Sequence, residues 1–326
     1  MLERKLLVVT GKGGVGKSTV AGALGLLAAQ RGLRTIVVEV GEQARLPELF
    51  GLPGCQTGVE TMLEEGLWSM SIDPDRALLE WLQTLGGRVS GRLLASSSTF
   101  QYFAAAAPGA KELVSMVKIW ELTQDERRRR RAGYDLVVLD GPATGHALGM
   151  LHSPRTFGAI ARVGPIAGQS QQVRELLENP ANSSYLAVAQ GTEMAVTETL
   201  ELTDGLQRNL GRELQAVVVN ALLPQRFTAA ELRRIAQLSV EHPPARAAAG
   251  PTSTPGAGPV SDAVVHSAAS AARAVHDRAR FQHNQLARLR RRNFDVLAVP
   301  FVFTAELDLP AVRGIAEQLG RRLKGS

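Results

Sequence analysis

Six short apolar runs alternate along the chain with longer segments in which apolar residues have helical spacing. The runs cover residues 6–9, 35–40, 136–139, 185–189, 216–219 and 296–299. Runs of valine, leucine and isoleucine without polar interruption are typical of strands that are buried on both faces of a parallel sheet. The pattern therefore predicts an α/β fold with a doubly wound, mainly parallel sheet.

Two parts of the chain depart from this alternation. Residues from about 75 to 131, and again from about 151 to 180, have helical apolar spacing, and they predict a helical subdomain inserted into the connections of the sheet. Five prolines and three glycines between residues 243 and 259 predict a flexible loop at about 241–260, followed by a long helix. Near the C-terminus, residues 310–323 predict a short helix that packs on the sheet. We expect a single domain over residues 1–326.

Residues 11–19 read Gly-Lys-Gly-Gly-Val-Gly-Lys-Ser-Thr and lie between the first predicted strand and a helix-forming segment. Glycines allow successive backbone N–H groups to point at phosphate oxygens, and the helix N-terminus adds partial positive charge. The side chain of Lys17 is expected to reach the β- and γ-phosphates, and the Ser18 hydroxyl is expected to ligate Mg²⁺. The motif predicts a nucleoside triphosphate site made by Gly13, Gly14, Val15, Gly16, Lys17, Ser18 and Thr19.

The second lysine of this loop, Lys12, is unusual because Lys17 already serves the γ-phosphate. One interpretation is a solvated surface lysine, since most lysines are exposed. The other is a catalytic lysine that leaves its own subunit, crosses a dimer interface and neutralises phosphate charge in the partner's site, as an arginine finger does.

A second phosphate-site motif begins at Asp140, which ends the apolar run at 136–139. An aspartate at the carboxyl end of a strand beside the phosphate loop can hold Mg²⁺ through water. The residues that follow it read Gly-Pro-Ala-Thr-Gly-His. A strand-terminal aspartate alone is weak evidence, but Asp140 followed by these six residues is strong evidence when it is paired with the two-lysine loop.

On these motifs the chain resembles the ArsA family, which includes arsenite-pump ATPases and ATPases that deliver tail-anchored membrane proteins. Residues 12–18 match the family's Lys-Gly-Gly-x-Gly-Lys-Ser/Thr loop, and residues 140–146 match its Asp-x-x-Pro-Thr-Gly-His switch with a slight variation. The resemblance implies ATP and Mg²⁺ as ligands and a signal from the γ-phosphate through residues 144–148 to the helical subdomain. It also implies that Asn220 reads the adenine edge and that the loop with Pro300 and Phe301 packs against the base. The alternative for Asn220 is a turn residue at a strand end.

The chain departs from the family at the first switch. An aspartate normally follows the second strand there and positions the attacking water, but alignment on the Leu-Phe-Gly at residues 49–51 places Gly41 at its position. Glu39 and Glu42 flank this glycine, and Glu42 is our candidate for a catalytic replacement. Since positioning dominates phosphoryl transfer, we expect slow or absent hydrolysis.

The composition of the chain reduces the number of functions that fit it. Cys55 is the only cysteine, so the chain lacks both the several cysteines that bind arsenite and the paired cysteines of the zinc clasp in the targeting ATPases. No apolar run approaches the ~20 residues of a membrane span, and a first strand near residue 5 leaves no room for a signal peptide; we expect a cytoplasmic protein. The arginine runs at 127–131 and 288–292 predict solvated helix ends rather than a nucleic-acid surface, because no aromatic residues interleave with them.

Three functions stay open on these grounds. The first is an ATP-driven homodimer, or heterodimer with a paralogue, whose helical subdomain holds a hydrophobic protein client. The second is a positioning ATPase similar to ParA or MinD that acts on DNA or membrane, and the third is a weakly active subunit that pairs with a complete paralogue. A group of apolar residues in the predicted subdomain has two interpretations: the residues line a groove for a client, or they form the subdomain's own core. The group consists of Leu93, Leu94, Phe100, Tyr102, Phe103, Met116 and Trp120.

Overall fold

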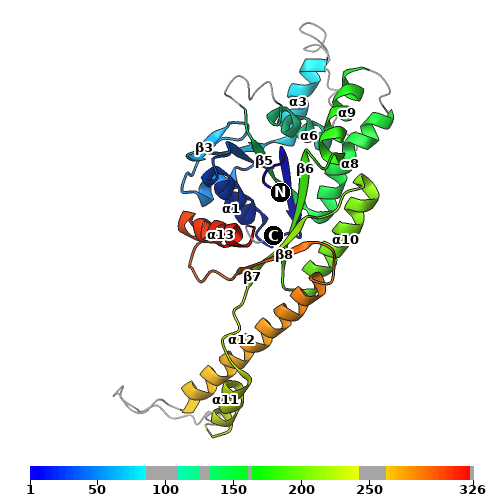
Figure 1. Cartoon of the computed structure of the whole chain (residues 1–326). Helices are drawn as coiled ribbons and strands as arrows, with labels where there is room; N and C mark the ends of the chain where they lie inside the picture. The colour runs from blue at the N-terminus through cyan, green and yellow to red at the C-terminus, as the bar shows by residue number, and fades with distance from the viewer. Residues whose placement is uncertain (86–108, 125–132, 161–163, 242–261, 324–326) are drawn as a thin grey trace, which may run out of the picture.

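The computed structural model describes residues 1–85, 109–124, 133–160, 164–241 and 262–323 (Figure 1). Its core is an eight-stranded sheet in the order β3-β4-β2-β5-β1-β6-β7-β8. The strands are β1 (Leu6–Gly11), β2 (Thr35–Val40), β3 (Thr61–Glu64), β4 (Leu67–Ile72), β5 (Leu136–Ala143), β6 (Ser183–Gln190), β7 (Ala216–Leu222) and β8 (Asp295–Pro300). Neighbouring strands are parallel except for the antiparallel pair β3–β4. The predicted fold class is confirmed.

Strands β3 and β4 were not predicted from the sequence. Buried and half-exposed residues alternate along most of β4, whereas the predicted strands β1 and β2 are almost continuously buried. Alternation arises here because β4 and β3 form one edge of the sheet, where one face is covered less completely.

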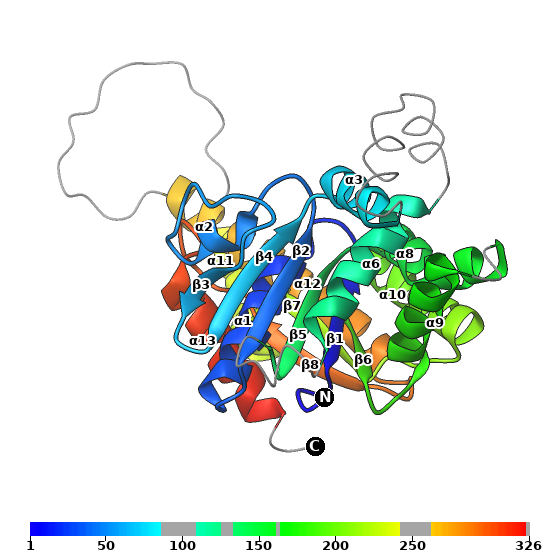
Figure 2. The same cartoon turned by 90° about the horizontal axis from the view of Figure 1, so that it is seen from above.

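Helices cover both faces of the sheet (Figures 1 and 2). On one face, α1 (Lys17–Gln30) packs against α13 (Leu309–Arg322). The apolar residues of α13 at 312, 315, 316 and 319 are all buried, as expected for a helix that packs on the sheet. On the other face lie α8 (Thr144–Ile160), α10 (Glu193–Leu210) and the inner part of α12 (Asp262–Leu289). The carboxyl ends of the parallel strands form one edge of the sheet, where a doubly wound sheet places its ligands.

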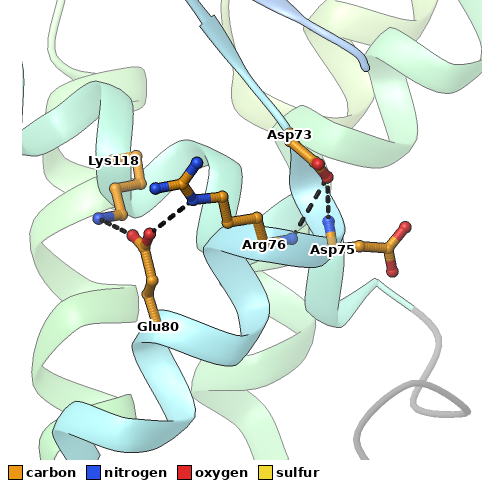
Figure 3. Close-up of polar contacts among 5 residues, drawn as sticks. All are labelled: Asp73, Asp75, Arg76, Glu80 and Lys118. Carbon is orange, nitrogen blue, oxygen red and sulfur yellow. Dashed lines mark hydrogen bonds and ion pairs between the residues drawn. The ribbon is translucent and has the colours of Figure 1, made fainter. Parts of the chain in front are cut away.

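Four helices pack on one another beside this edge: α3 (Pro74–Leu85), α6 (Ala110–Leu122), α8 and α9 (Pro165–Glu178). Glu80 on α3 accepts from Arg76 and from Lys118 of α6, each at 3.1 Å, and Asp73 caps α3 by accepting from two backbone N–H groups (Figure 3). These helices occupy the segments predicted as an inserted subdomain, while the division of the chain into a domain with an insertion stays a prediction.

The structure corrects one prediction about the apolar residues of this region, and other predicted features lie outside the described residues. Met116 is fully buried and Trp120 is half-buried against the core, so Met116 cannot line an open groove. The other five residues considered for a client groove lie outside the described residues, as do the arginine run at 127–131 and the predicted loop beyond residue 241. The second arginine run begins at the end of α12 and its last three residues are exposed, as expected for a solvated helix end.

A pair of helices that the sequence did not predict as a unit extends away from the sheet. α11 (Ala229–Glu241) lies against the first part of α12, and the two project beyond the body of the molecule (Figure 1). Gln282 of α12 ties this pair to the sheet, because its Oε1 accepts from the backbone N–H of Leu223 at 2.8 Å.

Candidate nucleotide-binding site

The predicted phosphate loop connects β1 directly to α1, and its glycines are required by local geometry. Gly16 has φ +91°, and a Cβ at this position would lie 2.4 Å from the Asn220 side-chain nitrogen. Gly11 has φ +145°, and its Cβ would lie 2.1 Å from the carbonyl oxygen of Val188. A larger residue at either position would force the loop away from the sheet. Val15 is buried and anchors the loop between these points.

Lys17, Ser18 and Asp140 meet in a pocket of about 440 Å³ beside the loop. The half-buried Lys17 ammonium donates to the carbonyl oxygen of Lys12 at 3.2 Å, and burial lowers its pKa while the charge of Asp140 raises it. The residues predicted to hold phosphate and metal are therefore brought together at one edge of the sheet.

Asp140 provides the test of whether this pocket suits Mg²⁺. The carboxyl group is buried, and its Oδ1 has no hydrogen-bond partner in the described part of the chain. Burial raises the pKa of Asp140, and the Ser18 hydroxyl, Lys17 and Arg45 act in the opposite direction. A carboxylate beside a hydroxyl is the oxygen-rich ligand set that Mg²⁺ prefers, with the remaining positions left to phosphate and water. The residues fit the ion.

A second pocket of about 400 Å³ lies on the opposite side of the loop. Asn220, Pro300 and Phe301 line it together with Gly14 to Gly16 and Thr19, as expected for a base site. The Asn220 amide also has a structural task that sequence reasoning missed, since its Nδ2 donates to the Val15 carbonyl oxygen at 2.9 Å. Gln190 also lines this pocket and was not predicted; it is opposite Asn220 in the register of β6 and β7.

The segment after β2 closes the phosphate pocket from the other side. Gly41 and the exposed Glu42 line the pocket, so Glu42 lies near the predicted site without a defined contact in it. Glu39 is buried, lies opposite Asp140 in the register of β2 and β5, and accepts from the backbone N–H of Leu46 at 3.0 Å. Glu39 thereby holds the start of α2 (Arg45–Leu49).

Burial raises the pKa of Glu39 from 4.5 to about 7, with backbone N–H groups of α2 opposing the shift and Asp140 adding to it. The stability that this raised pKa contributes is fully present below pH 4.5 and is lost as the pH rises through 7; the difference between about 7 and 4.5 corresponds to roughly 3 kcal/mol of unfolding free energy.

We expect Glu39→Gln, which keeps an acceptor for Leu46, to lose less stability than wild type between pH 5 and 8.5 without Mg²⁺. Thermal melts across this range measure it, with the exposed Glu42→Gln as the matched control. An unchanged pH profile would contradict a carboxyl group buried at this site.

The position of Lys12 differs from the sequence-based expectation that it points out of its subunit. In the single chain its ammonium forms an ion pair with Glu198 of α10, and both side chains are about 30% exposed. This ion pair links the phosphate loop to α10, which lies on the face of the sheet opposite α1. Because partly exposed ion pairs contribute little, this pairing does not fix the lysine permanently.

Comparison with known proteins agrees with the two phosphate motifs. The family of anion-transporting ATPases, ArsA, matches residues 4–165. The ATPase BagA of Mycobacterium tuberculosis is 30% identical over 250 residues, which cover 74% of this chain and 72% of that protein. The arsenical pump-driving ATPase of Acidiphilium multivorum is 24% identical over 236 residues, covering 67% of this chain and 40% of that protein. The ATPase ASNA1 homolog 1 of Paramecium tetraurelia is 32% identical over 152 residues, covering 46% and 44%.

The chain belongs to the ArsA family of ATPases, as its two phosphate motifs predicted. None of the helices in the described ranges has both the length and the hydrophobicity of a membrane span.

Proposed function

We propose that the chain is an ATP-dependent switch in which Mg²⁺ and ATP close two subunits and closure changes the binding of a client protein. The observation that supports this most is the pocket in which Lys17, Ser18 and the unpartnered Asp140 oxygen converge. Lys17 would bind the β- and γ-phosphates, Ser18 and Asp140 would hold Mg²⁺, and the ion would supply positive charge for phosphoryl transfer. The adenine lies in the second pocket, between Asn220 and the loop with Pro300 and Phe301.

The path from pocket to client follows one continuous segment. β5 ends at Ala143 and α8 begins at Thr144 with no intervening loop, and Gly141 and Pro142 line the phosphate pocket. α8 in turn contacts α6, α9 and α10. A displacement at the γ-phosphate therefore moves α8 as a helix and reaches the helical layer, where a hydrophobic client protein binds. The partner subunit is a second copy or a paralogue, and the cytoplasm is the compartment that fits this role.

This function is tested by the association state of the purified protein. Light scattering with Mg²⁺ and a non-hydrolysable ATP analogue should give twice the mass found without nucleotide. Equal masses under both conditions would contradict the closing dimer. Binding of the analogue without dimerisation would instead favour a nucleotide-binding subunit that needs a different partner.

Gly41 supports slow hydrolysis by the isolated chain. A Cβ built at Gly41 meets no atom within 4 Å, so a side chain fits there without strain. We expect Gly41→Asp to raise turnover by about tenfold or more, because a carboxylate that positions water typically contributes 10²–10⁴-fold. Steady-state phosphate release measures this effect, and Gly41→Asn, which has the same shape without the charge, should give a smaller increase. Wild-type turnover of ~1 s⁻¹ or more would contradict the slow hydrolysis.

A further inference from the structure

Arg45 is the first residue of α2 and lines the phosphate pocket together with Lys17, Ser18 and Asp140. Its side chain is exposed, and in the described ranges no hydrogen bond or ion pair occupies its guanidinium group. Its charge nevertheless acts on a carboxyl group of the pocket lining, because burial raises the pKa of Glu39 and the positive charge of Arg45 opposes this shift.

Hydrogen bonds to Glu39 and from Ser71 hold the backbone around Arg45 in place. Glu39 accepts from the N–H groups of Arg45 and Leu46, which replaces the side-chain cap that Ala44 does not provide. The Ser71 hydroxyl lies 3.0 Å from the carbonyl oxygen of Gly41 and 3.2 Å from that of Gln43. The loop from β2 to α2 is thus fixed at both ends, while the side chain it presents to the pocket stays free to bind.

The pocket has room for a guanidinium group beside Gly41. Gly41 lines the same pocket, and the space where its side chain would be is open for at least 4 Å. A guanidinium group is planar and presents parallel N–H donors that match two phosphate oxygens, and it keeps its charge at any pH that a protein tolerates.

We propose that Arg45 binds the γ-phosphate of the nucleotide within its own subunit, as an arginine finger supplied in cis. The proposal rests on the nucleotide site proposed above and adds a ligand that distinguishes the triphosphate from the diphosphate. It gives separate tasks to three cationic side chains. Lys17 and Arg45 bind the phosphates of their own subunit, while Lys12 acts on the phosphates bound by the partner subunit. An arginine in this role stabilises the charge that develops on the transferred phosphoryl group.

Calorimetry with Mg²⁺ tests this assignment through binding rather than turnover. Arg45→Ala should weaken the affinity for a non-hydrolysable ATP analogue by about tenfold or more, while the affinity for ADP changes less than about twofold. Arg45→Lys should restore part of the preference for the triphosphate, because it returns the charge without the bidentate geometry. Arg31→Ala, which removes an exposed arginine at the opposite end of α1, is the matched control and should leave both affinities unchanged.

Two outcomes would overturn the proposal. An Arg45→Ala protein that keeps the wild-type preference for the triphosphate excludes γ-phosphate binding by this residue, and so does an equal loss for both nucleotides in a variant that melts like wild type. If thermal melts show that the fold of Arg45→Ala is damaged, Arg45→Gln takes its place in the same comparison of the two affinities. A wild-type protein that binds neither nucleotide contradicts the nucleotide site itself, so failure of the two proposals is distinguishable.

Discussion

Lys17→Ala is expected to lower the affinity for Mg²⁺ and ATP by at least about 100-fold, since one charged side chain makes several charge-assisted bonds of roughly 1.5–3 kcal/mol each. The half-buried ammonium already lies on the loop, where it donates to the carbonyl oxygen of Lys12 at 3.2 Å. Binding of the triphosphate replaces this single bond by bonds to the β- and γ-phosphate oxygens. Calorimetry with a non-hydrolysable ATP analogue gives the affinity directly.

The fold should survive this substitution. Burial disfavours the charged form of Lys17, which is why its pKa is lowered, and among the described residues its ammonium makes a single hydrogen bond, to the carbonyl oxygen of Lys12. The melting temperature of Lys17→Ala without nucleotide should therefore equal or exceed that of wild type. Affinity close to the wild-type value in a folded variant would remove the basis of the nucleotide site.

Lys12→Ala is expected to retain nucleotide binding but to lose ATP-dependent association, and turnover should fall by about 10³-fold if the lysine acts as a finger across a dimer. The side chain is available for this role because its bond to Glu198 is partly exposed and weak. A contact made only in the closed state shifts the population toward that state. Light scattering and phosphate release measure the two effects on one preparation.

Glu198→Gln is the control that separates this role from a structural one. If the pair with Glu198 only stabilises the phosphate loop, removing either partner should have the same effect. If Lys12 acts on the partner subunit, Glu198→Gln should keep ATP-dependent association while Lys12→Ala loses it. Association of Lys12→Ala at the wild-type level would exclude the transfer of this lysine across an interface.

The strands were predictable where several apolar residues follow one another in the sequence. The six apolar runs all became strands: the run at 35–40 has the bounds of β2, and the other five are extended by two to four residues. β3 and β4 escaped prediction because their composition is mixed and because buried and half-exposed residues alternate along β4. The paired extension of α11 and α12 escaped it as well, because nothing in a single helical pattern tells which other helix it contacts.

The sequence by itself determined the family and supports the proposed nucleotide chemistry, because both depend on local patterns. The glycines, Lys17 and Ser18 are adjacent in the chain, and Asp140 is recognisable as the acid that ends the apolar run at 136–139, although β5 itself continues to Ala143.

Only the tertiary structure decided which groups control these residues. Asn220 bonds to Val15 across 205 positions of the chain, and Lys12 meets Glu198 across 186. Such contacts arise where the parallel strands end at one edge, and they leave no trace in local spacing. Arg45 is the clearest case. On the sequence it is one arginine among many, and its position over the phosphate pocket follows from a buried carboxyl group on β2 that holds the backbone of α2.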